Sequence, residues 1–545
     1  MKFSHHALLI ATAVVGVGAF APQPFATTRS KISEGSYSFL QNGESRLFVS
    51  NFLQNIFGGN NNDGAVNGNG GELYDLVIIG GGVSGMASAL SFREECGVDV
   101  AVSSDEDKAE EDSSISDKKV LVLEASSTLG GRVQSDVTED GFIMDRGFAV
   151  FIEEYPFAKK LLDYADLELC KFEPGALVYT GVEGMLYKVA DPIRRPADLF
   201  VALTAPVGEF TDKLKVLPLL FHVFTTSIDD LFKEEEMDTL SCLKERWGFS
   251  DKFISEFMQP FLEGIYLAPL KEQSSQMFHF VFKMFSEGYA CLPKNGLNAV
   301  SAQMASKCKE EGVEFKMNSA VTGIDTSSEH INIKTNGASV SAKSIVLATE
   351  GNIAERLLSG LPSIDSIEEQ VQRSVSCLYY TFDSKVPISE PILILNGSER
   401  DAKNNPVNNI CFPSVVSSNY SPDGENICSV TILKPAMDLY EGNLDDLDKA
   451  VRKQISSWFP SEFSDDILNG WVLKESYSIK SAQPAQYGGI SPANVNGGKD
   501  CSSFRESSLP SGIFVCGDHM ATATLNGALE SGVNAGKSVA SFLEK

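Results

Sequence analysis

An uninterrupted apolar run that ends in a cluster of glycines constrains the fold of this chain most strongly. Residues 74–85 read YDLVIIGGGVSG, so Leu76 to Ile79 lead without a polar break into the glycines. Met86 to Phe92 then follow with a helical pattern. This order predicts a buried parallel strand, a tight turn and the start of a helix.

The glycine spacing matches the G-x-G-x-x-G pattern of dinucleotide-binding folds at Gly80, Gly82 and Gly85. In that pattern the first glycine makes the turn, the second lets the backbone approach a pyrophosphate, and the third packs the helix on the strand. The N–H groups and the dipole of a helix N-terminus favour phosphates. We therefore expect these glycines and the intervening Val83 and Ser84 to bind a dinucleotide.

Composition excludes several classes of protein. The chain has 545 residues, of which 43% are hydrophobic and 22% charged, as in ordinary globular proteins. Its net charge of -28 argues against nucleic acid and against an anionic membrane surface as partners. The 10 cysteines are scattered without a C-x-x-C pair, so we predict no metal site.

The N-terminus has the pattern of a targeting segment. Residues 1–19 carry one lysine, an apolar run and small residues at the end, which predicts a signal peptide. Phe20-Ala21-Pro22 follows, and residues 20–71 resemble a transit peptide of complex plastids followed by a flexible linker. This pattern indicates import into a plastid. Secretion is the alternative, with glycosylation sequons at Asn396 and Asn419.

A dinucleotide fold needs an acidic residue after its second strand to bind the ribose hydroxyls. Asp105 lies in an acidic segment with the composition of a solvated loop, whereas Glu124 directly ends the apolar run Val120 to Leu123. We therefore assign the ribose to Glu124.

The residues that follow Glu124 resemble a known family. The order Glu124-Ala125, then Leu129-Gly130-Gly131-Arg132, then Asp145-Arg146-Gly147-Phe148 is similar to the FAD-dependent superfamily of flavin amine oxidases, protoporphyrinogen oxidase and phytoene desaturases. The resemblance implies FAD as the cofactor and an α/β fold, in which a discontinuous Rossmann-like domain accompanies a mixed α+β substrate domain. It also implies that matching residues contact the pyrophosphate and flavin, namely Ala125, Gly130, Gly131, Arg132, Gly147 and Phe148.

The resemblance continues toward the C-terminus. It places the backbone of Val321 near adenine, although the same residues are equally consistent with a structural strand. Ile513 to Asp518 reads as a strand that ends in Gly517 and Asp518, and residues 525–542 read as a long helix. We expect Gly517 and Asp518 to hold the cofactor, and the helix start at Leu525 and Asn526 to direct its positive end at the flavin.

The remaining segments are predicted to form the substrate side. Helical patterns occur at Phe253 to Leu267 and Met277 to Phe285, and Val216 to Phe224 is an apolar run too short to span a bilayer. We expect core packing for that run, with peripheral membrane contact as the alternative. Short runs of alternating residues between 354 and 507 predict an antiparallel sheet above the flavin.

These patterns divide the chain into two domains after the leader. Residues 72–155, 291–353 and 508–545 are predicted to form the FAD domain, and residues 156–290 and 354–507 the substrate domain. The predicted reaction removes hydride from an apolar molecule such as a polyene or tetrapyrrole, with oxygen or a quinone as acceptor. Alternatives are an amine oxidase, a redox-neutral carotenoid isomerase and a non-catalytic assembly protein.

No side chain stands out as a catalytic base, as is expected where a flavin carries the chemistry. Relatives of the monoamine oxidase type place an aromatic residue near the start of the last helix, but residues 520–530 contain none. An amine is therefore the less favoured substrate. Lys294 remains unassigned. His519 is expected to orient structure, and Arg194 and Arg195 either cap structure or attract a carboxylate-bearing substrate.

Overall fold

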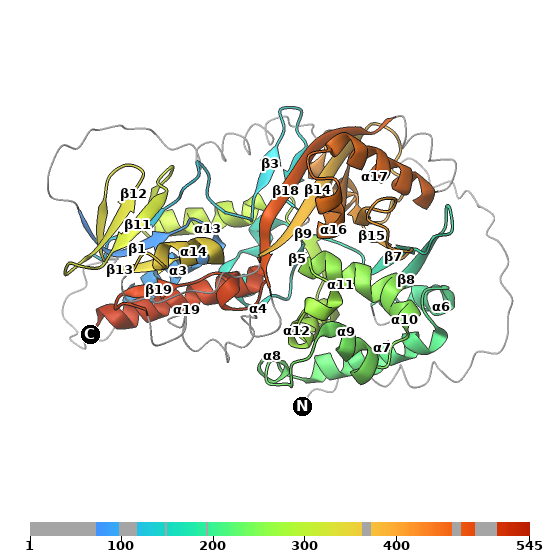
Figure 1. The fold of residues 1–545 in the computed structure, drawn as a ribbon, viewed down its shortest axis with the longest axis horizontal. Helices are drawn as coiled ribbons and strands as arrows, with labels where there is room; N and C mark the ends of the chain where they lie inside the picture. The colour runs from blue at the N-terminus through green and yellow to red at the C-terminus, as the bar shows by residue number, and fades with distance from the viewer. Residues whose placement is uncertain are drawn as a thin grey trace, which may run out of the picture. The chain divides into compact units, whose positions relative to one another are not determined.

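The computed structural model describes residues 72–97, 117–147, 150–191, 194–361, 372–459, 470–485 and 509–545. The described residues fall within one compact unit of the chain and form two large sheets with their helices (Figure 1). The predicted leader and linker, Asp105 and Phe148 lie outside the described residues.

The first sheet has a parallel body. Its strands run in the order β10-β2-β1-β13-β12-β11, and β19 also pairs with β13. The parallel strands are β1 (Leu73–Ile79), β2 (Val120–Leu123), β10 (Glu314–Lys316), β13 (Val340–Leu347) and β19 (Ile513–Val515). Two antiparallel strands complete it, β11 (Val321–Asp325) and β12 (Ile331–Thr335).

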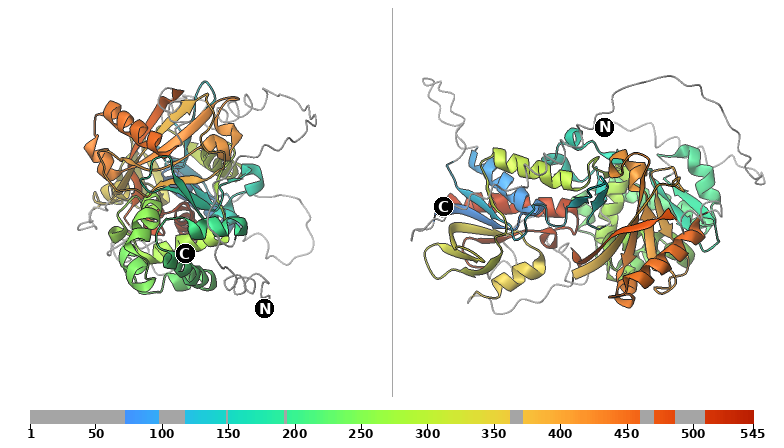
Figure 2. Two further views of the ribbon diagram at one scale, coloured as in Figure 1. Left: turned by 90° about the vertical axis from the view of Figure 1, so that its right-hand side faces the viewer. Right: turned by 90° about the horizontal axis from the view of Figure 1, so that it is seen from above.

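Alternate residues of β1 pack on opposite faces of this sheet, because successive side chains of a strand point to opposite sides. Leu76 and Ile78 share a core with α3 (Val83–Gly97), α13 (Asn298–Glu310) and α19 (Leu525–Leu543). Val77 and Ile79 share another core with α14 (Gly351–Leu358). Viewed from above, α14 lies on the opposite side of the strands from α3, α13 and α19 (Figure 2).

The crossing of α3 and α19 depends on glycines. A Cβ at Gly532 would lie 2.2 Å from the backbone carbonyl oxygen of Ser84, and a Cβ at Gly536 would lie 2.4 Å from that of Ser88. The two helix backbones therefore approach more closely than any side chain allows at these positions. This contact joins the last helix of the chain to the helix that follows the glycine turn.

The second sheet is mainly antiparallel, in the order β18-β14-β17-β16-β15-β7-β8, with a parallel pair between β15 and β7. Its strands are β7 (Gly175–Tyr179), β8 (Leu186–Ala190), β14 (Gln372–Phe382), β15 (Leu393–Asn396), β16 (Val407–Cys411), β17 (Asn426–Leu433) and β18 (Val472–Pro484). The predicted fold class, α/β with an additional antiparallel sheet, is confirmed. Strands β7 and β8 come from a region in which the sequence had indicated mainly helices.

Most of the remaining helices come from the middle of the chain. The predicted helical pattern at 253–267 forms α10 (Asp251–Phe253), a π-helical turn (Ile254–Met258) and α11 (Gln259–Tyr266), and that at 277–285 lies in α12 (Ser275–Glu287). The others are α4 (Pro156–Leu161), α5 (Tyr164–Leu167), α6 (Leu199–Thr204), α7 (Phe210–Thr225), α8 (Ile228–Leu231), α9 (Thr239–Ser241), a second π turn (Cys242–Arg246), α15 (Pro413–Val416), α16 (Lys434–Leu439) and α17 (Leu444–Trp458).

Short strands form two further small sheets, and short 3₁₀ turns occur between the larger elements. Short pairings form between β3 (Ser135–Val137) and β4 (Ile143–Asp145), and among β5 (Phe151–Ile152), β9 (Ala290–Leu292) and β6 (Cys170–Lys171). The 3₁₀ turns are η2 (Pro196–Asp198), η5 (Leu270–Glu272), η6 (Ser418–Tyr420) and η9 (Asp518–Met520).

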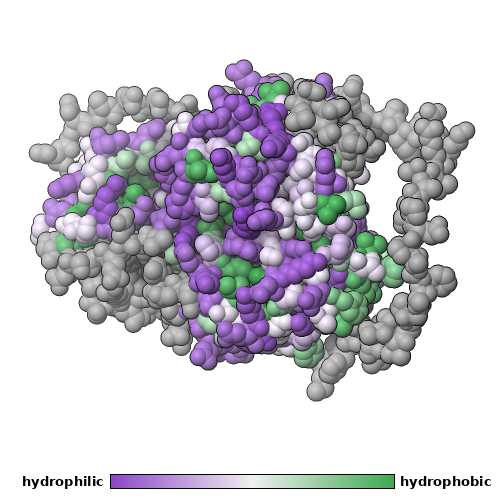
Figure 3. All heavy atoms as spheres, turned by 45° about the vertical axis from the view of Figure 1, so that its right-hand side comes forward, coloured by the Kyte–Doolittle hydropathy of each residue, from purple (hydrophilic) through white to green (hydrophobic). Residues whose placement is uncertain are grey.

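Helix α7 contains the apolar run Val216 to Phe224, and core packing accounts for only part of it. Leu219 and Val223 are fully buried, but Phe221 is 72% and Phe224 64% exposed. Together with Phe210 and Leu214 of α7 and Phe200 and Val201 of α6, they form an exposed apolar face, which we call the α6–α7 face (Figure 3). In the described part of the chain, no helix is long and apolar enough to cross a membrane.

Candidate functional site

The glycine turn after β1 adopts the geometry that its spacing predicts. Gly80 has φ +114°, a conformation that side chains other than glycine rarely adopt. A Cβ at Gly85 would lie 2.1 Å from the Gly80 oxygen, so the third glycine lets α3 start directly against the turn. Val83 and Ser84 form the first turn of α3, and both are buried.

The second glycine differs from the other two because its surroundings are open. Among the described residues, a Cβ at Gly82 would meet nothing closer than the Gly130 oxygen at 4.0 Å. Gly82 and Gly130 form an isolated parallel bridge, and the nearest atom to a Cβ at Gly131 would be the Gly82 Cα at 3.6 Å. The two predicted glycine motifs therefore lie against each other and leave backbone accessible at the N-terminus of α3.

Glu124 lies beside this turn, at the end of β2. Its Oε2 accepts a 2.8 Å hydrogen bond from the Gly81 N–H, and its Oε1 accepts one from the Ser126 N–H at 2.8 Å. The N–H of Ser319 bonds to the Glu124 carbonyl, which brings Val321, the first residue of β11, close to the same site. The carboxylate retains lone pairs for the ribose hydroxyls that we assigned to it.

Arg132 and Asp518 form a bidentate ion pair, although they are 386 residues apart. The Arg132 Nη1 and Nη2 donate to the two carboxylate oxygens at 2.8 and 2.6 Å, and Nη1 also donates to the Ala482 carbonyl. Burial alone would lower the pKa of Arg132, but the attraction of Asp518 raises it above its usual value. The structure thus brings together two predicted cofactor residues from opposite ends of the chain.

His519 follows Asp518 directly in the chain and is buried. Burial lowers the pKa of His519 to about 4, since the opposing attraction of Asp518 is smaller and the charge of Arg132 adds to the lowering. The ring is therefore neutral near pH 7. A Cβ at Gly517 would lie 2.5 Å from the His519 Cε1, so the ring occupies the space beside the Gly517 backbone.

Residues 521–524 link η9 to the start of α19. Thr524 caps this helix, because its side chain accepts a hydrogen bond from the Gly527 N–H at 3.1 Å. The Asn526 Oδ1 accepts from the Phe157 N–H at 2.9 Å, which ties the helix start to α4. Leu525 and Asn526 therefore lie at a capped helix N-terminus, whose dipole favours an anionic group nearby.

Gly147 lies apart from the glycine turns, next to the second sheet. It has φ +92°, and a Cβ there would lie 2.9 Å from the Ile479 Cδ1 of β18. Ala125 is exposed in the turn after Glu124. The predicted residues thus form a cluster along the glycine turns, a second around Arg132 and Asp518, and single positions at Gly147 and at the start of α19.

The sequence left Asp145 without a role. The carboxylate is fully buried and accepts hydrogen bonds from the Ser135 hydroxyl at 2.6 Å, the Leu297 N–H at 3.0 Å and the Tyr420 hydroxyl at 2.8 Å. Burial raises the pKa of Asp145, and these hydrogen bonds oppose the shift. Asp145 therefore joins β4 to α13 and η6. Its partners are up to 275 residues away along the chain, and no local pattern identifies them.

A cluster of His222, Glu234 and His279 has the composition of a metal site. Their ligand atoms all lie within 4.8 Å of one another. However, the Arg246 Nη1 donates to the Glu234 Oε2 at 2.8 Å, and the Trp247 Nε1 donates to the His279 Nε2 at 3.1 Å. Because that nitrogen must accept, the proton of neutral His279 lies on Nδ1, which faces Glu234. The Arg246 guanidinium and the Trp247 ring N–H thus already occupy ligand atoms that a metal ion would need.

Three basic residues that the sequence left open have structural partners. The Arg194 guanidinium bonds to the Asp191 carboxylate and to the carbonyls of Gly288 and Phe285, and Arg195 pairs with Glu173 and Asp198. Both arginines thus stabilise local structure. Lys294 pairs with Glu168 in an exposed contact.

Comparison with known proteins identifies the class of this fold. Residues 114–540 match the family described as flavin containing amine oxidoreductase. No curated protein sequence matches the chain.

Solved structures share the same fold at low sequence identity. A putative protoporphyrinogen oxidase from Exiguobacterium has a TM-score of 0.60 and 18% identity, and the match covers 88% of this chain and 100% of that one. Wild-type putrescine oxidase bound to putrescine has a TM-score of 0.59 and 13% identity, covering 87% and 100%. Cyclohexylamine oxidase from Brevibacterium oxydans has a TM-score of 0.59 and 14% identity, also covering 87% and 100%.

Proposed function

The chain belongs to the flavin-containing amine oxidoreductase family, and from this premise we propose that it removes hydride from an apolar small molecule, a polyene or a tetrapyrrole. The chain is an FAD-dependent oxidoreductase, since its family is that of the flavin-containing amine oxidoreductases. The substrate is the part that we propose.

The residues of the site fit FAD. Backbone lies open at Gly82 beside the N-terminus of α3, where a diphosphate is favoured, and Glu124 ends β2 where a ribose is expected. Arg132 supplies a cation close to the glycine turns, held in place by Asp518. We propose that these residues hold the cofactor, together with Gly131 and the start of α19.

Bound FAD supplies the hydride acceptor, and the chain's own groups bind and orient. His519 is neutral near pH 7, so it contributes no positive charge beside Arg132 and Asp518. The capped N-terminus of α19 favours negative charge near Leu525. Asp145 holds β4 against α13 and η6, which positions the adjacent Gly147 segment.

The start of α19 is the observation that carries the proposed substrate. Relatives that oxidise monoamines place an aromatic side chain there, whereas this chain has Thr524 as the helix cap and Asn526 bonded to the backbone of α4. Neither residue offers an aromatic face to an amine. This supports an apolar substrate over an amine.

An amine oxidase is the second candidate. Putrescine oxidase and cyclohexylamine oxidase, two of the structural neighbours, are named for amine substrates. Their identities of 13% and 14% are too low to transfer a substrate, so the choice depends on experiment.

Anaerobic reduction of the bound flavin distinguishes the candidates. We expect a polyene or a porphyrinogen to bleach the flavin absorbance of the purified protein, while putrescine and cyclohexylamine leave it unchanged. Bleaching by an amine alone would favour an amine oxidase. Conversion of a polyene without net bleaching would favour an isomerase, and inertness to every class would favour a non-catalytic assembly protein.

The acceptor and the compartment are also proposals. Oxygen or a quinone would re-oxidise the flavin, and stopped-flow mixing of the reduced protein with each would identify the faster one. The N-terminal pattern supports import into a plastid. A fluorescent fusion of the full chain is expected to label plastids, and a secreted fusion would contradict this.

A further inference from the structure

The two glycosylation sequons of the chain differ in how deeply the fold buries their asparagines. Asn396 is 3% exposed, whereas Asn419 is half-buried. An N-linked glycan is a bulky polar group, and the asparagines that carry one normally lie on surface loops. The burial of Asn396 therefore conflicts with the modification that its sequence permits.

The backbone of this sequon is packed on both sides. Asn396 is the last residue of β15, which lies between β16 and β7 in the second sheet. The next residue, Gly397, donates its N–H to the Tyr179 carbonyl of β7 at 2.8 Å. A Cβ at Gly397 would lie 2.3 Å from the backbone carbonyl oxygen of Glu256, which belongs to the π-helical turn before α11. The sequon thus occupies the interior of the sheet and not a surface loop.

The side-chain amide of Asn396 is bonded at both ends. Its Nδ2 donates to the Val407 carbonyl at 2.9 Å, and its Oδ1 accepts from the N–H and the hydroxyl of Ser398 at 3.2 and 2.6 Å. The Val407 carbonyl also accepts from the Nε2 of Gln454 on α17 at 3.3 Å, and both of these residues are buried. The amide nitrogen that would carry the glycan therefore lies among buried groups of β16 and α17.

The chemistry of the transfer shows what the fold would have to admit. The Asn396 Nδ2 would bond to the anomeric carbon of an oligosaccharide carried on a lipid diphosphate. The bond from that carbon to the diphosphate would break, the lipid diphosphate would leave, and one proton would leave the nitrogen. Because protein interiors are close-packed, a sugar ring beside this nitrogen would require β16 or α17 to move away.

We infer that glycosylation of Asn396 and this fold exclude each other. A chain that is modified at Asn396 before it folds does not reach this structure, and a chain that has reached it no longer accepts a glycan there. The inference goes beyond the proposed function and does not depend on the substrate. It also favours import into a plastid over secretion, because passage through a glycosylating compartment would lower the yield of folded protein.

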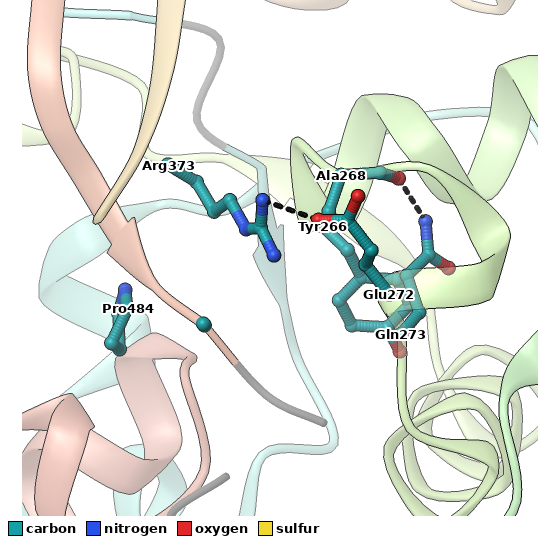
Figure 4. Close-up of a pocket in the computed structure, with 7 residues that line it drawn as sticks. Tyr266, Ala268, Glu272, Gln273, Arg373 and Pro484 are labelled. Atoms are coloured by element: carbon teal, nitrogen blue, oxygen red, sulfur yellow. Dashed lines mark hydrogen bonds and ion pairs between the residues drawn. The ribbon is translucent and has the colours of Figure 1, made fainter. Parts of the chain in front are cut away.

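An exposed position supplies a matched control. The side chain of Glu272 in η5 is 51% exposed, and its carboxylate pairs with Arg373 at 2.7 Å (Figure 4). Because Ser274 follows two residues later, Glu272→Asn creates a further sequon at the surface. An ion pair with so exposed a carboxylate contributes little stability, so this variant is expected to fold.

Secretory expression of the full chain tests the inference. The chain is placed behind a strong secretory signal peptide in a eukaryotic cell, and soluble, protease-resistant protein is separated from aggregated protein. Enzymatic release of the glycans in ¹⁸O-labelled water, followed by peptide mass spectrometry, measures the occupancy of each sequon. We expect Asn396 to be occupied at least about tenfold less often in the folded fraction than in the aggregated one. The site created by Glu272→Asn is expected to be occupied alike in both.

Two substitutions at Ser398 separate the effect of the glycan from that of the hydroxyl group. Ser398→Ala removes the sequon, whereas Ser398→Thr keeps both the sequon and the hydroxyl that bonds to Asn396. We expect Ser398→Ala to raise the folded yield in secretory expression and Ser398→Thr to leave it low. In a bacterial cytosol without N-glycosylation, both variants and the wild type are expected to fold in comparable yield.

Two results would overturn the inference. One is a folded fraction that carries the glycan at Asn396 as often as the aggregated fraction does. The other is the absence of the glycan from Asn396 in both fractions, because something other than the fold would then exclude it. Flavin absorbance is recorded separately. Folded protein that is unmodified at Asn396 but binds no FAD would support the inference and contradict the proposed function, and yellow protein that is glycosylated at Asn396 would do the reverse.

Discussion

The Arg132–Asp518 pair joins two segments that are 386 residues apart in the chain. The Asp518 side chain is 8% exposed and that of Arg132 31%, so removing the carboxylate leaves a poorly solvated cation. We predict that Asp518→Ala lowers the free energy of unfolding by about 1–3 kcal/mol. Urea denaturation measures this, and the exposed Asp383→Ala serves as control with an expected change under about 0.5 kcal/mol. Equal effects would show that the pair contributes nothing specific.

His279 makes the stability of the folded protein depend on pH. Burial lowers its pKa to about 4, with Arg246 adding and Glu234 opposing, whereas an unfolded histidine titrates near about 6.5. Between these values the unfolded chain binds the extra proton, so the stability that neutral His279 contributes is present above about pH 6.5 and is lost as the pH falls toward 4.

The variant His279→Gln isolates this contribution, because glutamine can accept from Trp247 and donate to Glu234 without titrating. We predict that the wild type loses up to about 1.4 kcal/mol more stability per pH unit than His279→Gln between pH 6.5 and 4. Urea denaturation at several pH values measures the difference. A constant difference across this range would contradict the assignment.

At the scale of elements, the crossing of α3 and α19 leaves no room for a side chain at Gly532 or Gly536. Gly532→Ala would place a Cβ 2.2 Å from the Ser84 oxygen, and the helices must separate to admit it. We predict a loss of about 1–3 kcal/mol in the free energy of unfolding and weaker retention of flavin, because α3 begins directly after the glycine turn. Lys537→Ala, at an exposed position of the same helix, is the control. Melting temperature and flavin absorbance measure both effects, and equal values for the two variants would contradict the account.

The exposed apolar side chains of the α6–α7 face lead to a prediction about a partner. Phe210, Leu214, Phe221 and Phe224 follow helical spacing on α7, and the ammonium groups of Lys213 and Lys252 bond to carbonyls at the end of α6, beside these side chains. Exposed aromatic residues along one helix suit the interface of a lipid bilayer, whereas the net charge of -28 disfavours an anionic one. We propose that this face makes the peripheral membrane contact, with a lipid surface as its occupant.

Co-sedimentation with vesicles of phosphatidylcholine tests this contact. The wild type is expected to pellet with the vesicles and the double variant Phe221→Ser, Phe224→Ser to stay in the supernatant. Leu439→Ser with Leu444→Ser removes exposed apolar side chains elsewhere and is the matched control. A wild type that never pellets, or a control that fails equally, would contradict the proposal.

At the scale of the whole molecule, the sequence predicts the features that local patterns encode, but it does not predict those that depend on long-range contacts. The glycine turn, the strand before Glu124 and the alternating runs of the second sheet are encoded within a few residues, and the structure has them where they were expected. The partners of Asp145 depend on residues that meet only after folding. The exposure of Phe221 and Phe224 also escaped prediction, because an apolar residue on a helix carries no local sign of whether another element covers it.

The central claim is that segments from both ends of the described chain assemble one FAD site, and Gly82→Val tests it most directly. A Cβ at Gly82 meets no described atom within 4.0 Å except the Gly130 oxygen, so the fold should tolerate the side chain while a bound diphosphate does not. Gly97→Val, whose Cβ meets no described atom within 4 Å, is the control. Calorimetric titration of the apoproteins with FAD should show binding at least about tenfold weaker for Gly82→Val, with melting temperatures unchanged. Equal FAD affinity in all three proteins, or no FAD binding by the wild type, would contradict the claim.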